Sequence, residues 1–176
     1  SQDCSNFNSG AYTGEINSEM LREIGCKFSI IGHSERRNLF NETEEIISNK
    51  IHNSIESNII PIFCIGESLQ QRKENLTNKI LKNQILKSLP KNANKNNLII
   101  AYEPIWSIGT GLIPDLKQIS EVHTFIKENI INAKVVYGGS VKSNNYKKIL
   151  ELKSVDGLLI GGASLKLDEF NQILKF

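Results

Sequence analysis

The chain has 176 residues, of which 39% are hydrophobic and 23% are charged, and its net charge is only +2. We expect one soluble domain over residues 1–176, since this length supplies a sizeable core. The weak net charge predicts no nucleic-acid partner, and no apolar run approaches the roughly 18 residues of a membrane span. Three widely spaced cysteines show no metal-ligand spacing, so we expect no metal site and a reducing cytoplasm.

The first part of the chain predicts two helices and two strands after an N-terminal loop. Asn17 or Ser18 caps a short helix that Gly25 ends, and Thr43 caps a helix whose isoleucines recur every four residues. The second strand is almost wholly apolar, as expected of a strand buried on both faces. In chain order, these elements are a helix at 19–24, a strand at 26–31, a helix that follows Thr43 and ends near Asn58, and a strand at 59–65.

The second part of the chain continues this alternation. Strand and helix alternate throughout, which predicts a parallel sheet covered by helices. The topology fits either a doubly wound sheet or part of a barrel. The expected elements are a helix at 76–89, a polar connection at 90–97, a strand at 98–102, a helix at 115–131, a strand at 134–137, a helix at 144–152, a strand at 157–160 and a closing helix at 168–176.

Two of the expected strands end in side chains suited to proton transfer. Glu103 directly follows the strand at 98–102, and His33 follows the strand at 26–31. The carboxyl ends of parallel strands meet at one edge of the sheet, where βα barrels place their chemistry. A carboxylate at that edge acts as a general base if water is kept away from it. For this stretch taken by itself, an ordinary exposed glutamate is an equally good explanation.

His33 has a structural alternative, because a lone histidine at a strand end is more often a satisfied structural residue. Residues 34–37 are expected to start a helical turn whose free N–H groups face the imidazole. Such a turn lowers the pKa of His33 and keeps the ring neutral, so that it donates a hydrogen bond to a carbonyl. The simplest role of Glu35 is a pair with Arg36 or Arg37.

The segment that follows Glu103 has the composition of a lid. Pro104 stiffens its entry, Trp106 supplies an apolar body, and Gly109 and Gly111 permit large backbone changes. A surface loop punctuated by proline and glycine is the plainer alternative. The expected lid residues are Pro104, Ile105, Trp106, Ser107, Ile108, Gly109, Thr110 and Gly111.

Glycine turns follow the last two expected strands, at 138–140 and 161–162. Such turns present bare backbone N–H groups, and the helix N-termini after them favour negative charge. Together with Gly109 they predict a phosphate site built mainly from backbone donors. One Gly-Gly pair is weak evidence because many turns use glycine. Two such turns after consecutive strands match the usual phosphate position in a (β/α)8 barrel.

With these residues in view, the sequence resembles the triosephosphate isomerases. The matching motifs occur in the order of that family, from the first residues to the last, which makes a chance match negligible. The resemblance implies an α/β fold of the TIM (β/α)8 barrel type, present from the end of strand 3 through helix 8. The motifs are GAYTGE at 10–15, IIGHSERR at 30–37, CIGE at 64–67, AYEPIW at 101–106, IGTG at 108–111, YGGSV at 137–141 and GGASL at 161–165.

The resemblance implies an activity and a set of site residues. The family interconverts dihydroxyacetone phosphate and D-glyceraldehyde 3-phosphate in glycolysis and gluconeogenesis, with no metal or organic cofactor. By resemblance, Glu103 moves a proton between adjacent carbons, and neutral His33 polarises the carbonyl. Glu35 is a supporting residue, and the lid at 104–111 closes over the phosphate. The implied phosphate ligands are the backbone N–H groups of Gly109, Ser140, Gly161 and Gly162.

The resemblance also implies a partner. The family is normally a homodimer, in which the loop that matches residues 4–15 enters the neighbouring subunit. Thr13 matches the tip residue that approaches the partner's site. Glu15 and Arg36 match a pair that bridges the interface.

The resemblance begins at the end of the family's third strand, at residues 1–3. We therefore expect the C-terminal part of the barrel, without the first two strands, the catalytic lysine and a neighbouring asparagine. That lysine places positive charge beside the substrate phosphate and the oxyanion, and losing such a group typically costs orders of magnitude in rate. The alternative function is an inactive remnant, or an anion- or partner-binding protein of the same fold. Another phosphosugar enzyme, such as an indole-glycerol-phosphate synthase, shares only the two glycine turns.

Overall fold

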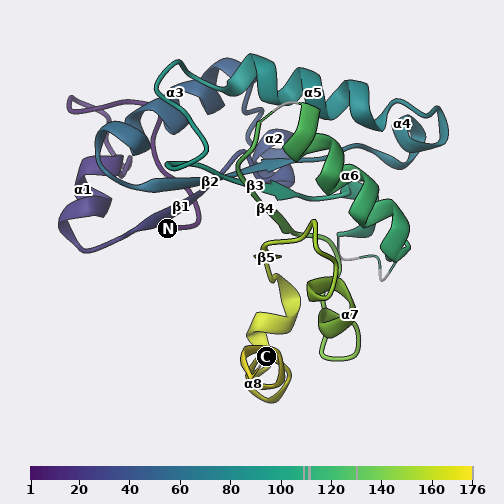
Figure 1. Cartoon of the computed structure of the whole chain (residues 1–176). Helices are drawn as coiled ribbons and strands as arrows, with labels where there is room; N and C mark the ends of the chain where they lie inside the picture. The colour runs from purple at the N-terminus through teal and green to yellow at the C-terminus, as the bar shows by residue number, and fades with distance from the viewer. Residues whose placement is uncertain (109, 111, 130, 176) are drawn as a thin grey trace.

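The computed structural model describes residues 1–108, 110, 112–129 and 131–175. At the centre of the described residues is a five-stranded parallel sheet, in which each strand pairs with the next one along the chain (Figure 1). The predicted parallel sheet is confirmed, and all five strands lie where they were expected, some a few residues shorter. The strands are β1 (Phe28–Ile31), β2 (Ile60–Ile65), β3 (Ile99–Tyr102), β4 (Lys134–Tyr137) and β5 (Gly157–Leu158).

The strand order distinguishes the two topologies that the sequence left open. A doubly wound sheet contains a point where the strand order reverses. The order here is sequential from β1 to β5, which is the order of a barrel. The described sheet does not close on itself: β1 and β5 lie at its two ends, and the N–H of Ile30 in β1 donates to the carbonyl of Ser1 at 3.0 Å.

Because parallel crossovers are right-handed, a sequential order places the connecting helices on one face of the sheet. Figure 1 shows α3, α5 and α6 along that face, and α3 contacts β1 and β2 while α6 contacts β4. The helices are α1 (Ser18–Glu23), α2 (Ser34–Leu39), α3 (Glu44–Glu56), α4 (Leu69–Lys73), α5 (Thr77–Ser88), α6 (Leu116–Asn129), α7 (Tyr146–Leu150) and α8 (Leu167–Leu174), with 3-10 turns η1 (Ile105–Ser107) and η2 (Gly162–Leu165).

The helix ends follow the expected chemistry of caps. The side chain of Asn17 accepts the N–H of Met20 at the start of α1, and Thr43 caps α3 in the same way. Three helices, α2, α3 and α4, end in an asparagine that takes the left-handed conformation, as glycine usually does. These residues are Asn41, Asn58 and Asn75, with φ of 55°, 58° and 57°.

The two faces of the sheet differ in burial. Phe63 and Ile65, which alternate along β2, are fully buried. Ile60 and Ile62 point to the opposite face and are half-buried. The expectation that 59–65 is buried on both faces is therefore wrong for these two residues, because the helices cover one face and the described sheet does not close around the other.

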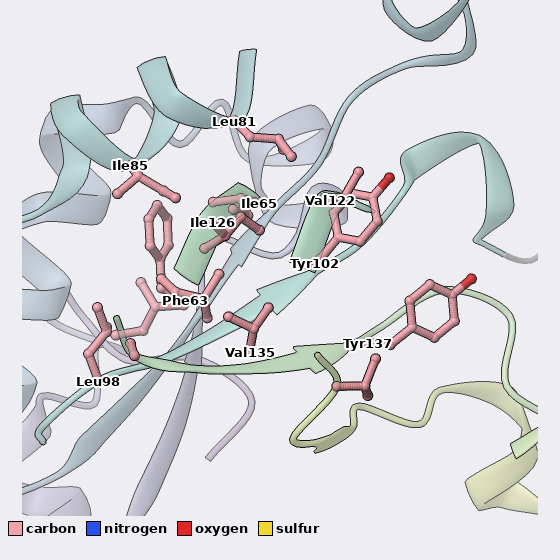
Figure 2. Packing of buried hydrophobic residues seen from close by; sticks show 14 of the residues in the cluster. Phe63, Ile65, Leu81, Ile85, Leu98, Tyr102, Val122, Ile126, Val135 and Tyr137 are labelled. Atoms are coloured by element: carbon pink, nitrogen blue, oxygen red, sulfur yellow. The ribbon is translucent and has the colours of Figure 1, made fainter. Parts of the chain in front are cut away.

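The hydrophobic core lies between the strands and the helices that cover them. Figure 2 shows most of the labelled side chains gathered between the sheet and helices α5 and α6, with Tyr137 apart from them at the end of β4. Leu81 and Ile85 of α5 and Ile126 of α6 are fully buried there. Burial of each such side chain stabilises the fold by about 1.5–3 kcal/mol. The packed core on this face therefore fixes the positions of the strand ends relative to one another. Among the described helices, none has the length and apolar character that crossing a membrane requires.

Candidate active site

The ends of β1 and β3 bring together the two side chains singled out for proton transfer. His33 lies two residues after β1, and Glu103 directly follows β3. Although β2 lies between these strands, Nε2 of His33 is 3.2 Å from Oε1 of Glu103. The predicted convergence of these two residues at one edge of the sheet is thus present in the structure.

Glu103 is held in place by the ladder on both sides of its strand. Its N–H donates to the carbonyl of Ile65 at 2.8 Å, and the N–H of Gly138 donates to the carbonyl of Tyr102 at 2.8 Å. Two glycines make room for it. A Cβ at Gly66 would lie 1.7 Å from the carbonyl oxygen of Glu103, and a Cβ at Gly138 would lie 2.8 Å from its Cγ. Both positions therefore require glycine because the glutamate occupies the space of a side chain.

The environment of the Glu103 carboxyl favours its neutral form. The residue is only 2% exposed. Burial raises the pKa of the Glu103 carboxyl to about 8, although hydrogen bonds from the Ser34 backbone and the Cys64 side chain and the charge of Arg37 act to lower it. A carboxyl with a pKa near neutrality both accepts and returns a proton readily.

His33 is the N-cap of α2, and this position fixes its tautomer. Its Nδ1 accepts the backbone N–H of Glu35 at 3.2 Å. A neutral imidazole with an acceptor at Nδ1 carries its proton on Nε2, the atom that faces Glu103. Burial lowers the pKa of His33, although the nearby Glu35 carboxylate acts to raise it. The predicted helical turn against the imidazole is confirmed, and the site pairs a carboxyl with a neutral ring N–H.

The carboxylate of Glu35 lies apart from this pair. Its side chain is 70% exposed, and its Oε2 is 3.9 Å from Nδ1 of His33, on the side of the ring away from Glu103. The backbone N–H of Glu35 rather than its carboxylate makes the closest contact with the candidate site.

A second buried glutamate holds the start of the candidate lid. Glu67 follows β2, and its side chain is fully buried. Its Oε1 accepts from Nη1 of Arg72, the hydroxyl of Tyr102 and Nε1 of Trp106, each at 3.1 Å. The indole is thereby tied to the sheet edge, and the Arg72 guanidinium lies 5.6 Å from the centre of that ring.

The described part of the lid contains further internal hydrogen bonds. Pro104 leads into η1 with a φ of −59°, which suits its ring. The Thr110 hydroxyl donates to the carbonyl of Trp106 at 2.9 Å. Ser107, at the end of η1, is fully buried, and its hydroxyl donates to the carbonyl of Leu112 at 2.6 Å. These bonds join the first half of the lid to Thr110 and to Leu112, which directly follows the lid.

Three of the four candidate phosphate ligands follow β4 and β5, which are neighbouring strands. The N–H of Ser140 after β4 is within hydrogen-bond distance of the Ser107 hydroxyl. Gly161 and Gly162 after β5 are exposed, and a Cβ at either would meet nothing within 4 Å. Gly109 and Gly111, which were expected in the lid, lie outside the described residues.

The residues assigned to a dimer interface lie on or near the N-terminal loop. Thr13 and Glu15 are exposed. Arg36 binds within its own chain, with Nη2 3.0 Å from Asp3 and Nε 2.7 Å from Glu42. Partial burial acts to lower the pKa of Arg36, but the hydrogen bond to Glu42 and the charges of Asp3, Glu42 and Glu15 outweigh it and raise the pKa.

Comparison with known proteins agrees with this geometry. The family model described as triosephosphate isomerase matches residues 1–176. The chain belongs to the triosephosphate isomerase family. It is 48% identical to the triosephosphate isomerase of Francisella philomiragia subsp. philomiragia and 46% identical to that of Mycoplasma mobile, in each case over 96% of this chain and 70% of the relative.

The crystal structure of triosephosphate isomerase from Bartonella henselae matches the fold with a TM-score of 0.89. That match covers 99% of this chain and 74% of the Bartonella chain, at 37% identity. The barrel-type α/β fold implied by the resemblance is thereby confirmed. As a member of the triosephosphate isomerase family, the protein is an aldose–ketose isomerase by class.

Sequence reasoning missed the contacts that three residues make at the site, and it gave two of them, Cys64 and Glu67, no role. Cys64 contacts the Glu103 carboxyl, and burial raises the pKa of its thiol well above the usual value. Glu67 could have been found from its position after Gly66, because it follows a buried strand as Glu103 does. Ser107 was placed in the lid, but its bonds to Leu112 and Ser140 carried no signal in the sequence.

Proposed function

We propose that this protein interconverts dihydroxyacetone phosphate and D-glyceraldehyde 3-phosphate, with Glu103 as the base. The observation that carries this proposal is the 3.2 Å approach of Nε2 of His33 to Oε1 of Glu103. A buried carboxyl beside a neutral N–H donor is the pair that proton transfer next to a carbonyl requires.

Each group then has a defined part in the reaction. Glu103 takes a proton from the carbon that bears the hydroxyl, and the bonding electrons form an enediolate with the adjacent carbonyl. Nε2–H of His33 donates a hydrogen bond to the oxygen on which negative charge develops. The hydroxyl proton passes from one oxygen to the other by way of Nε2 of His33, and Glu103 returns its proton to the neighbouring carbon. Both residues regain their starting states, so the reaction consumes no co-reactant. Glu35 supports His33 through the N–H that its backbone donates to Nδ1.

The substrate phosphate is proposed to bind to backbone N–H groups in the lid and at the ends of β4 and β5. The donors are those of Gly109, Ser140, Gly161 and Gly162. The adjacent pairing of β4 and β5 and the open backbone at the two glycines of the second turn support this site. The lid at 104–111 is proposed to cover the bound phosphate and limit the entry of water.

The assembly is proposed to be a homodimer in the cytoplasm. Thr13 is the residue that approaches the partner's site, and Glu15 and Arg36 bridge the interface. The loop around them exposes the apolar side chains of Phe7 and Tyr12, whose rings stack with centroids 4.1 Å apart. Free thiols at all three cysteines are in keeping with a reducing compartment.

The decisive experiment measures isomerase turnover of the purified chain beside a Glu103→Ala variant. The rate of solvent deuterium incorporation into dihydroxyacetone phosphate is measured in the same samples, since it reports proton abstraction separately from full turnover. Turnover and exchange that the substitution abolishes support the proposal. A folded, phosphate-binding protein that neither isomerises nor exchanges would contradict it and favour a non-catalytic anion-binding role.

A further inference from the structure

The hydroxyl of Ser107 connects three parts of the candidate site. It donates to the carbonyl of Leu112 at 2.6 Å and accepts the backbone N–H of Ser140 at 3.2 Å. In return, the hydroxyl of Ser140 donates to the carbonyl of Ser107. Ser107 is fully buried, so its oxygen is shielded from water while it makes these contacts. One side chain therefore joins the lid, the residue that directly follows it and the glycine turn after β4.

The glycine turn comes this close because Gly139 has no side chain. A Cβ at Gly139 would lie 2.2 Å from the hydroxyl of Tyr137 and 3.0 Å from Oγ of Ser107. Neither contact is compatible with any larger residue unless the turn or the lid moves. The lack of a side chain at Gly139 is thus what allows the contact between Ser107 and Ser140.

The N–H of Ser140 is one of the donors assigned to the substrate phosphate. A backbone N–H carries one hydrogen and makes one strong hydrogen bond. In the structure that bond is directed at Ser107 rather than left free. A phosphate oxygen that binds Ser140 must therefore displace the Ser107 hydroxyl.

We propose that the hydroxyl of Ser107 is an internal stand-in for a phosphate oxygen. It holds the N–H of Ser140 while the site is empty and releases it when phosphate binds. This inference rests on the anion site of the proposed function and makes Ser107 a positioning residue that acts through Ser140. After release, Ser107 still donates to Leu112, so the lid keeps its bond to the residue that directly follows it.

The stand-in has an energetic consequence that a purely structural serine lacks. Its bond to Ser140 exists only in the unliganded protein, so removing it raises the free energy of that state relative to the bound state. Phosphate binding therefore becomes tighter in Ser107→Ala. The expected decrease in the dissociation constant is about two- to tenfold, the range that one neutral hydrogen bond contributes.

The test titrates inorganic phosphate into the ¹⁵N-labelled full chain, its Ser107→Ala variant and a Ser54→Ala control. Ser54 is also fully buried, but it lies in α3, where its hydroxyl is 3.6 Å from the sulfur of Cys4. We expect tighter phosphate binding only in Ser107→Ala. In the absence of phosphate, the Ser140 amide should exchange with solvent slowly in the parent and at least several-fold faster in Ser107→Ala.

Each failure has its own signature. If phosphate binds the parent at Ser140 and Ser107→Ala binds it equally or more weakly, the stand-in role is wrong although the anion site holds. If the Ser140 amide of the unliganded parent exchanges as fast as an exposed amide, the bond is absent. This result on the parent alone would contradict the proposal. If phosphate leaves the Ser140 resonance unchanged in the parent, the anion site itself is wrong, and the stand-in role fails with it.

Discussion

Nε2 of His33 lies 3.2 Å from Oε1 of Glu103, although the two residues belong to strands that are separated by a third. The contact is asymmetric. His33 is half-buried and has its other nitrogen satisfied by the backbone N–H of Glu35, whereas Glu103 is almost completely buried. The histidine therefore donates a hydrogen bond from Nε2, and the carboxyl is the group of the pair that gains and loses a proton.

This arrangement predicts the pH dependence of the reaction. A base whose pKa is raised to about 8 by burial is mostly protonated at pH 7, so it is inactive in most molecules. We expect log kcat/KM to rise with a slope near one up to about pH 8 and then to level off. A profile that is already flat between pH 6 and pH 8 would contradict this assignment.

Replacement of the base tests its role directly. Glu103→Gln keeps the shape of the side chain but cannot accept the proton, so kcat should fall by at least 10²-fold. Substrate binding should change far less, because the phosphate contacts are assigned elsewhere. Measurement of kcat and of inorganic phosphate affinity in the same variant separates the two effects, and near-full turnover in Glu103→Gln would rule out the base.

The same carboxyl links stability to pH. Its pKa is higher in the folded chain, about 8, than the ordinary value of 4.5, so the folded state holds the proton more tightly. The stabilisation that the folded state gains from this proton is fully present below about pH 4.5 and is lost as the pH rises through about 8. The complete loss is on the order of 5 kcal/mol. Thermal unfolding of Glu103→Gln should therefore show a flatter decline between pH 5 and pH 8 than the parent does.

The space that Glu103 occupies provides a third test. Gly138→Ala would place a Cβ 2.8 Å from Cγ of Glu103 and push the carboxyl away from His33. Since a displacement of about 1 Å costs up to 10²-fold in rate, kcat should fall by one to two orders of magnitude. Gly157→Ala is the matched control, because its Cβ would meet only a methyl of Val136 at 3.3 Å. Equal activity in the two variants would count against the requirement for glycine.

The sequence was sufficient to place His33 and Glu103 at the same edge of the sheet, because both follow apolar strands and parallel strands end together. It also predicted the helical turn that holds His33, since Ser34 begins a run suited to a helix N-terminus. The sequence did not predict the 3.2 Å contact itself, because that distance depends on the twist of three strands and on the glycines at 66 and 138.

Other features were missed for identifiable reasons. Helix α4 has only five residues, too few for a hydrophobic period, although Ser68 and Gln71 form a capping box that marks its start. The role of Glu67 arises from side chains of three separate segments that meet only in the folded chain. Periodicity in the sequence describes one segment at a time, so it does not predict contacts between side chains of different segments.

Glu67 provides the last prediction, which concerns the lid. Its Oε1 accepts three hydrogen bonds, one of them from Nε1 of Trp106, and its carboxylate faces Arg72. Glu67→Gln removes the negative charge opposite a partly buried guanidinium, which should destabilise the protein by roughly 1–3 kcal/mol and weaken the hold on the indole.

Trp106 is the only tryptophan in the chain, so its fluorescence reports the lid without interference. We expect Glu67→Gln to shift the emission to longer wavelength, as the indole becomes more exposed to water, and to raise KM for the phosphorylated substrate. Glu56→Gln is the control, because Glu56 is exposed and accepts one hydrogen bond from Asn92 at 2.8 Å. Its emission and KM should match the parent. Unchanged emission in Glu67→Gln, with the lower stability present, would mean that Glu67 supports the sheet edge but does not hold the lid.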